Sequence, residues 1–391
     1  MRYNFDKVID RSGTSAEKVE GLKHIWGRTD LIPLWVADMD FATAPFVTDA
    51  IRKRCENEVL GYTGKPDSYY NAIINWVKQR YDLIVTKEVI NFVPGIVPGI
   101  GMAMNCFTQK GDKVMIQPPV YHPFAWVTTR NERTLVINPL RWENGMYRMD
   151  LDAFREQIKG CKLFILCNPH NPGGVVWTEA ELRAIADICY DEKVLVFSDE
   201  IHADLTLPPH THRPFATVSE KARMNSVTFM SPSKAFNMPG LSASHALIFN
   251  EDLRKRFRIY MDAGELDMGH VFAFLSVEAA YSHGTEWLDQ CLAYIQGNID
   301  FVDDFLKNHA PKIKAIRPEA SYLVWLDCRE LKLSQKDLNE FFVDKAHLAL
   351  NDGEMFGKEG IGFMRLNVAS PRCIIEKAMK QLADAYQLYI K

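Results

Sequence analysis

Hydrophobic and polar positions alternate in blocks along the middle of the chain. Short and nearly continuous apolar runs occur at residues 113–119, 162–169, 193–200 and 226–233. Runs of this length without a polar face predict strands that are buried on both sides. Helical patterns lie between them, and the clearest begins with a T-x-x-E capping box at Thr178 and Glu181. This alternation predicts an α/β fold with a mostly parallel central sheet.

The last third of the chain has a different pattern. From about residue 285, helical stretches are mixed with apolar runs at 320–327 and 363–369, which predicts a smaller α+β domain. Near the N-terminus, the sequence LIPLWVADMDF is typical of a connecting segment rather than of a core strand. We therefore expect a large domain at 45–284 and a small domain formed by 1–44 and 285–391.

Composition limits the classes of partner. The chain has 391 residues, of which 46 are basic and 50 are acidic, so its net charge of -4 offers no basic surface for nucleic acid or anionic lipid. The apolar runs are far shorter than the roughly 20 residues of a membrane-spanning helix. Its eight cysteines show no C-x-x-C spacing, and the first ten residues are too polar for a signal peptide. We expect a cytoplasmic protein with reduced thiols that acts on a small molecule.

Polar residues follow three of the predicted strands at the point where each strand ends. Asp199 ends one apolar run, Asn168 and Asn171 follow another, and Lys234 follows the last. Each of them alone has an ordinary interpretation, as a helix cap, a turn residue or a solvated amine. Ligands of open parallel sheets bind beyond these strand ends, and a buried carboxylate there is costly unless a cation or donors meet it.

A glycine-containing segment at 93–107 adds a candidate anion site. Gly95 allows a tight turn and Pro98 suits a first helical turn, so the backbone amides of Ile96 and Val97 could face an anion at a helix N-terminus. The segment lacks the glycine spacing of dinucleotide or nucleoside triphosphate sites. An anion site, a carboxylate and a lysine are together what pyridoxal 5'-phosphate requires.

Motifs spread over essentially the whole chain resemble a known family. The order of NPHNPGG (168–174), SDEIH (198–202), SPSK (231–234) and RLNVA (365–369) resembles the fold-type I pyridoxal-phosphate enzymes of the class I/II aminotransferase family. LWVADMDF (34–41), GYTG (61–64) and PPVYHPF (118–124) resemble its cystathionine β-lyase branch, the MalY/PatB group. The resemblance implies a large domain with a mostly parallel sheet and a smaller α+β domain.

The resemblance also implies roles for residues around the cofactor ring. Lys234 would bind the cofactor covalently, and Asp199 would pair with its pyridinium nitrogen. Asn171 would donate to the phenolic oxygen and Tyr121 would stack on the ring, although Tyr121 could also be an ordinary packed aromatic. His202 stands where relatives carry a tyrosine, and it could donate to the same phenolic oxygen.

Further roles concern the phosphate and the substrate. Arg365, with Asn171, would bind the substrate α-carboxylate. Ser242 occupies the position of a phosphate-binding arginine in aspartate aminotransferase-like relatives. Phosphate binding would then depend on hydroxyls and backbone amides, namely those of Ser231, Ser233, Ile96, Val97 and Tyr62 of the partner subunit. The resemblance thus implies a homodimer with shared active sites.

The implied activity is β-elimination from cystathionine or another cysteine S-conjugate, which gives a thiol, pyruvate and ammonia, with Lys234 as base for the α-proton. An aminotransferase is the alternative, because the core residues serve both reactions. A regulatory partner-binding protein on the same fold is a third. His210 and His212 lie two apart among prolines with no third ligand in reach, so we expect a surface loop and no metal site. No G-x-S-x-G motif indicates a serine hydrolase.

Overall fold

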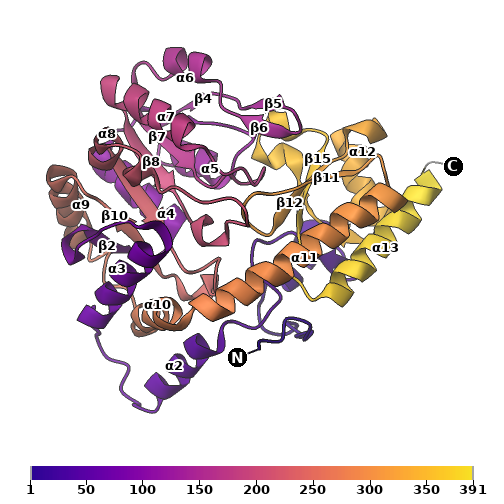
Figure 1. Ribbon diagram of the computed structural model, residues 1–391, viewed down its shortest axis with the longest axis horizontal. Helices are drawn as coiled ribbons and strands as arrows, with labels where there is room; N and C mark the ends of the chain where they lie inside the picture. The colour runs from indigo at the N-terminus through magenta and orange to yellow at the C-terminus, as the bar shows by residue number, and fades with distance from the viewer. Residues whose placement is uncertain (1, 390–391) are drawn as a thin grey trace.

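A seven-stranded sheet forms the centre of the computed structural model, which describes residues 2–389 (Figure 1). Its strands are, in spatial order, β2 (Ile90–Val93), β10 (Ser244–Leu247), β9 (Ser226–Met230), β8 (Leu195–Asp199), β7 (Cys161–Cys167), β3 (Lys113–Ile116) and β4 (Thr134–Ile137). The neighbours from β9 to β4 pair in parallel, whereas β10 is antiparallel to both of its neighbours. The prediction of a mostly parallel central sheet is confirmed.

Helices cover both faces of this sheet. On β7, Leu163 and Ile165 point to one face, while Phe164 and Leu166 point to the other, and all four are buried. The first face packs against α4 (Ile96–Phe107), α5 (Pro123–Arg130) and α9 (Glu251–Ala263). The second packs against α6 (Leu151–Gln157), α7 (Glu179–Asp191) and α8 (Glu220–Met224), and at the β2 end against α3 (Asp67–Tyr81) and α10 (Val271–His283). Burial on both faces explains the continuous apolar runs of the strand sequences.

The predicted capping box begins α7. Thr178 Oγ1 accepts a hydrogen bond from the Glu181 backbone N–H at 3.2 Å, and the Glu181 carboxylate accepts one from the Thr178 N–H at 2.8 Å. These two bonds satisfy amides that the helix itself leaves unpaired, which fixes where α7 starts after β7.

A four-stranded antiparallel sheet lies beside the central one. Its order is β11 (Lys314–Ile316), β12 (Leu323–Asp327), β15 (Phe363–Asn367) and β14 (Asn351–Asp352). Leu326 and Leu366 pack with the long helices α11 (Thr285–His309) and α13 (Arg372–Tyr389), which run together across Figure 1. On the other face Trp325 and Phe363 stack at 5.3 Å and join the same hydrophobic cluster as β3 and β7. This shared cluster holds β15 against the central sheet.

Short elements complete the chain. They are α1 (Glu17–Trp26), the parallel pair β1 (Ile32–Pro33) and β13 (Leu348–Ala349), the hairpin β5 (Arg141–Glu143) and β6 (Met146–Arg148), and α12 (Gln335–Glu340). The predicted connecting segment of residues 31–41 contains only the two residues of β1 as strand, and otherwise runs as irregular chain between the two sheets.

The helix α2 (Pro45–Cys55) and the stretch of residues 56–66 project from the body of the molecule, at the lower edge of Figure 1. α2 packs against α10 with Val47 fully buried, but apolar side chains of residues 56–66 are open to solvent: Val59 is 73% exposed and Tyr62 is 97% exposed. Among residues 2–389 we find no helix with both the length and the apolar character that crossing a membrane requires.

Candidate active site

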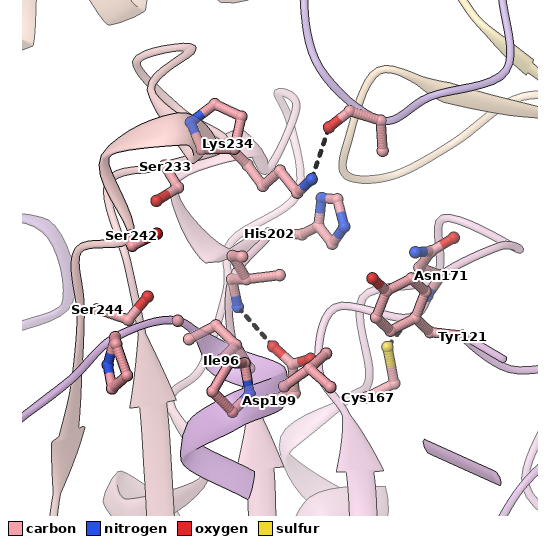
Figure 2. Close-up of a pocket in the computed structure, with 17 residues that line it drawn as sticks. Ile96, Tyr121, Cys167, Asn171, Asp199, His202, Ser233, Lys234, Ser242 and Ser244 are labelled. Atoms are coloured by element: carbon pink, nitrogen blue, oxygen red, sulfur yellow. Dashed lines mark hydrogen bonds between the residues drawn. The ribbon is translucent and has the colours of Figure 1, made fainter. Parts of the chain in front are cut away.

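A cavity of about 210 Å³ opens at the carboxyl ends of the parallel strands (Figure 2). It brings together most of the residues that the sequence singled out for a cofactor. Eight of them line it: Ile96, Val97, Tyr121, Asn171, Asp199, His202, Ser233 and Lys234. The rim therefore carries a carboxylate, an amide, an imidazole and an amine in one enclosed space.

Asp199 lies at the end of β8, where its side chain is almost fully buried, with 4% of the residue exposed. Burial raises the pKa of its carboxyl to about 7, although a hydrogen bond from the Ile201 N–H at 3.1 Å and the charge of Lys234 oppose the rise. A single backbone donor does not compensate a buried carboxylate for the loss of its hydration. The carboxyl would be stabilised as a carboxylate by a cationic ligand group.

Lys234 follows β9 and points into the cavity from the opposite side (Figure 2). Its Nζ donates a hydrogen bond to the carbonyl oxygen of Ala37 at 2.6 Å. Burial and, to a smaller extent, Arg365 lower the pKa of the amine to about 8, against the opposing charges of Asp38 and Asp199. An amine with this pKa supplies an appreciable unprotonated fraction near neutral pH, as a nucleophile or a general base requires.

The other end of the cavity is suited to an anion. Gly95 has φ +138°, a conformation that a residue with a side chain rarely adopts, and it directly precedes α4. The first amides of α4, those of Ile96 and Val97, therefore point out of the helix end towards the cavity. Hydroxyls of Ser233, Ser242 and Ser244 lie along the same wall, and the lining contains no arginine.

Tyr121 and His202 face the middle of the cavity (Figure 2). Burial lowers the pKa of His202 to about 3, with smaller contributions from Lys234 and Arg365, so the ring is neutral at pH 7. Its Nδ1 is buried and makes no hydrogen bond to any of the described residues. A neutral imidazole with a free ring nitrogen is available to a ligand.

Arg365 lies on β15, just outside the cavity lining, and only 4% of it is exposed. Its Nη1 donates to Asn171 Oδ1 at 3.1 Å, and its Nη2 donates to the Trp35 carbonyl at 3.0 Å and to Asn351 Oδ1. The Nε atom is buried without a partner among the described residues. The small sheet thus delivers a guanidinium to the edge of the cavity, next to Asn171.

Besides Arg365, two predicted residues are not part of the cavity lining. Ser231 is buried, and its hydroxyl lies 2.7 Å from both the carbonyl oxygen of Ala243 and Ser233 Oγ, so it supports the wall from behind. Tyr62 projects into solvent from the stretch of residues 56–66. It reaches no residue of the cavity within one chain.

The two histidines discussed as metal ligands differ in environment. His210 lies in an exposed position near Glu319, but His212 is 4% exposed and its Nε2 lies 2.7 Å from Glu200 Oε2. The expectation of a surface loop is therefore wrong for His212, because its ring is buried against the carboxylate of Glu200. Among residues 2–389, no three His, Cys, Asp or Glu side chains are grouped as a metal site.

Sequence reasoning missed several groups of the site. Ser244 starts β10, a strand that was not predicted, and because β10 runs antiparallel to β9 its amino end lies at the edge of the sheet where the cavity opens. The Ala37 carbonyl is a backbone acceptor, and no residue type signals it. Cys167, at the end of β7, also lines the cavity. The short apolar run at 246–249, which is typical of one more strand after Lys234, is the signal that could have pointed to Ser244.

The donor set fits pyridoxal 5'-phosphate. Among residues 2–389, the buried carboxyl of Asp199 accepts from one backbone amide and forms no ion pair, the Nδ1 of His202 has no hydrogen-bond partner, and no N-cap side chain accepts from the first amides of α4. A pyridinium nitrogen would pair with Asp199, a phenolic oxygen with His202, and a phosphate with the amides of α4. The Lys234 amine could react with an aldehyde.

The cofactor-free chain should show the effect of Asp199 on stability. Its carboxyl has a pKa of about 7 in the folded chain and an ordinary, lower value when unfolded, so it stabilises the fold at low pH. This stabilisation is lost as pH rises from about 4 to 7, by at most about 1.4 kcal/mol per pH unit. The amide of Asp199→Asn cannot titrate. The free energy of unfolding of the variant should therefore increase relative to that of the wild type between pH 5 and 7.5. Urea denaturation at both pH values measures this, and a constant difference would contradict it.

Comparisons with known proteins agree with this site. A family model described as "Aminotransferase class I and II" matches residues 29–382. Cystathionine beta-lyase PatB of Bacillus subtilis is 38% identical over 384 residues, which cover 98% of this chain and 99% of the relative. The structure of cystalysin from Treponema denticola, which contains pyridoxal 5'-phosphate, is similar with a TM-score of 0.96 and 34% identity, covering 100% of both chains. The PLP-bound C-S lyase of Staphylococcus hominis gives 0.91 and 36%, covering 99% of this chain and 98% of its own.

Proposed function

The chain belongs to the class I and II aminotransferase family of pyridoxal-phosphate-dependent enzymes, and from this premise we propose that it is a carbon–sulfur lyase. It cleaves cystathionine or another cysteine S-conjugate by β-elimination. The observation that carries the proposal is the Lys234 amine, held in the same cavity as the buried carboxyl of Asp199. The choice of elimination is supported by whole-length similarity to a cystathionine β-lyase and a C-S lyase.

We assign the cofactor contacts as follows. Lys234 would hold the cofactor covalently, Asp199 would pair with its ring nitrogen, and Tyr121 would stack on the ring. Asn171 and His202 would donate to its phenolic oxygen. Amides at the start of α4 and the hydroxyls of Ser233, Ser242 and Ser244 would hold its phosphate. These assignments are supported by the cavity position of each side chain, and they extend the predicted set by Ser242 and Ser244.

The bound cofactor would supply an aldehyde for the substrate amine and a ring that accepts an electron pair from the α-carbon. The residues of the chain supply binding and proton transfer. Arg365, relieved of the Asn171 oxygen, offers a bidentate fork to the substrate α-carboxylate and so orients the α-proton towards Lys234. The Lys234 amine, with its pKa near 8, removes that proton.

The proton that Lys234 gains can then be returned to the departing sulfur. Loss of the thiolate from the β-carbon converts the substrate, with one water, into a thiol, pyruvate and ammonia. The buried carboxylate of Asp199 would pair with the ring nitrogen of the bound cofactor and stabilise its positive charge, because solvent does not compete for a pair at this depth.

The test is to supply L-cystathionine to the cofactor-loaded enzyme without any 2-oxo acid and to measure pyruvate and thiol together. Equal amounts of both over many turnovers are expected. If pyruvate fails to form, but an added 2-oxo acid allows an amino acid to be converted, the enzyme is an aminotransferase and the elimination proposal is refuted.

We further propose that the enzyme is a homodimer with shared active sites, located in the cytoplasm. The dimer is supported by Tyr62 and Val59, which present large apolar side chains on a projecting stretch that contacts little of its own chain. The cytoplasm is supported by eight cysteines that are all free thiols. We also keep the division into a large domain at 45–284 and a small domain from 1–44 and 285–391 as a proposal.

Tyr62→Phe tests the shared site. If Tyr62 of the partner subunit donates to the phosphate, the variant should stay dimeric but release cofactor more easily, with an apparent Kd raised by roughly fivefold to tenfold. Dialysis followed by absorbance titration measures this. Tyr190→Phe, at a tyrosine 48% exposed on α7, is the control and should not change the Kd. A fully active monomer would exclude the shared site.

A further inference from the structure

Residues 35–41 lie between the two sheets and contact both functional cations through their backbone. The carbonyl oxygen of Trp35 accepts from Arg365 at 3.0 Å, and that of Ala37 accepts from Lys234 at 2.6 Å. The side chain of Asn367, on β15, donates to the neighbouring carbonyls of Val36 and Asp38 at 2.7 and 2.6 Å. A cation from the small sheet and a cation from the central sheet are thus held by carbonyls only two residues apart.

The same segment is bonded to the loop that carries Lys234. Asn237, three residues further along, donates to the carbonyls of Met39 and Phe41 at 3.0 and 2.7 Å. Its own side-chain oxygen accepts from the Met39 N–H at 3.0 Å. The segment is therefore bonded to the backbone region that carries Lys234 as well as to the amine of its side chain.

The acidic side chains of the segment are held by two cations from the N-terminal residues. Arg11 meets Asp38 at 2.5 Å and Asp40 at 3.0 Å, while Lys18 meets Asp40 at 2.8 Å and Asp38 at 3.5 Å. We call these four residues the charge clasp. The side chain of Lys18 has no exposed surface, and a buried ammonium is tolerated only when it is paired. The clasp does not donate to the cavity, so the proposed chemistry leaves it unexplained.

We propose that residues 35–41 are a positioning segment that sets the Lys234 amine and the Arg365 guanidinium relative to each other, and that the charge clasp holds this segment in place. The Ala37 carbonyl gives the amine a defined resting position whenever it is free. The inference rests on the proposed function, because that reaction requires the Lys234 amine and the Arg365 guanidinium to lie in a fixed relative position. Arg11 and Lys18 are positioning residues and do not contact the reacting groups.

The variants must separate position from charge. The charged groups that face the Lys234 amine are Asp38, Asp199 and Arg365, with the titratable His202 and Tyr121 also on the cavity wall. The double variant Lys18→Met with Asp40→Asn removes one charge of each sign and leaves all of these in place. Removing both partners of a buried pair also avoids an unpaired buried charge, which is the main threat to folding.

A second pair of substitutions guards against misfolding. Arg11→Met with Asp40→Asn is again neutral in net charge, and both side chains are partly exposed, at 23% and 21%. The matched control is Arg28→Met with Asp30→Asn. It removes the ion pair between Arg28 and Asp30, whose atoms are 2.6 Å apart, from the same N-terminal region. Among the described residues, this pair makes no hydrogen bond or ion pair to 35–41.

The first readout uses the cofactor-free full chain. Trace acetylation of Lys234 as a function of pH, read by peptide mass spectrometry, gives the pKa of its amine independently of any reaction. A carbonyl acceptor stabilises an ammonium more than an amine, so loosening the Ala37 carbonyl should lower the labelling midpoint. We expect a fall of about half a pH unit, equivalent to roughly threefold more free amine at pH 7. The control should keep the midpoint of the native protein.

The second readout is the loaded enzyme. A misplaced amine should lower kcat for cystathionine by roughly tenfold to a hundredfold, with the control within about twofold of the native enzyme. If both clasp variants fold, with thermal midpoints like that of the control, and the Lys234 midpoint is unchanged, the inference is overturned. The labelling result stands even if cystathionine is not the substrate, so failure of the proposed function remains distinguishable.

Discussion

Replacing Lys234 with alanine should abolish both the visible absorption of the bound cofactor and the turnover of cystathionine. Among the residues that the structure describes, the variant loses the only amine that lines the cavity, and with it the proposed covalent attachment and the base for the α-proton. General base catalysis alone contributes about 10²–10⁴-fold, so activity should fall by at least about 10³-fold. Absorbance spectra and pyruvate release, measured on the same preparation, check both effects.

Lys336→Ala is a suitable control for this experiment, because Lys336 is 85% exposed on α12 and lies on the small sheet side of the molecule. It should keep the native spectrum and rate. If Lys234→Ala retained the visible absorption of the cofactor, another amine would be its attachment point, and the assignment of the whole cavity would have to be revised.

Asp199→Asn should leave the fold intact, weaken cofactor binding and lower kcat by roughly 10²-fold to 10³-fold. An ion pair at about 4 Å contributes about 4 kcal/mol at an effective dielectric near 20, and an amide cannot supply it. Because the carboxyl is buried, no solvent ion can replace the lost charge. Circular dichroism, cofactor titration and steady-state kinetics measure the three effects.

The control for Asp199→Asn is Asp187→Asn, on the exposed side of α7, where the carboxylate only pairs with Lys221 at 3.3 Å. It should change neither the Kd for the cofactor nor kcat. Native activity in the Asp199→Asn variant would show that the ring nitrogen needs no carboxylate partner in this enzyme.

Much of the architecture followed from local patterns. The apolar runs that became β3, β7, β8 and β9 predicted a mostly parallel sheet, and the capping box at Thr178 predicted the start of α7. The direction of β10 was not predictable in this way. A short buried strand has the same apolar composition in either direction, and only its pairing with β9 and β2 reveals which way it runs.

The positions of candidate residues could be predicted where a side chain follows a strand end. Lys234, Asp199 and Asn171 line one cavity because neighbouring parallel strands end at one edge. Backbone groups such as the Ala37 carbonyl carry no signature in the residue type. The role proposed for Tyr62 requires a second subunit, so no pattern within one chain can place it. The burial of His212 depends on Glu200, a tertiary contact that the neighbouring prolines do not indicate.

The positioning segment also determines when a nascent chain can acquire an active site. Residues 35–41 leave the ribosome early, but Lys234 is 197 residues from its acceptor Ala37, and Arg365 is 330 residues from Trp35. Contacts of such long sequence separation form late, after local helices and neighbouring strands. The Lys234 amine can meet the Ala37 carbonyl only after residue 234 of the 391 has been made, and Arg365 can join the same segment only when nearly all of these residues are present. We expect nascent chains that end before β15 to bind the cofactor loosely, so that maturation of the enzyme is coupled to completion of its synthesis.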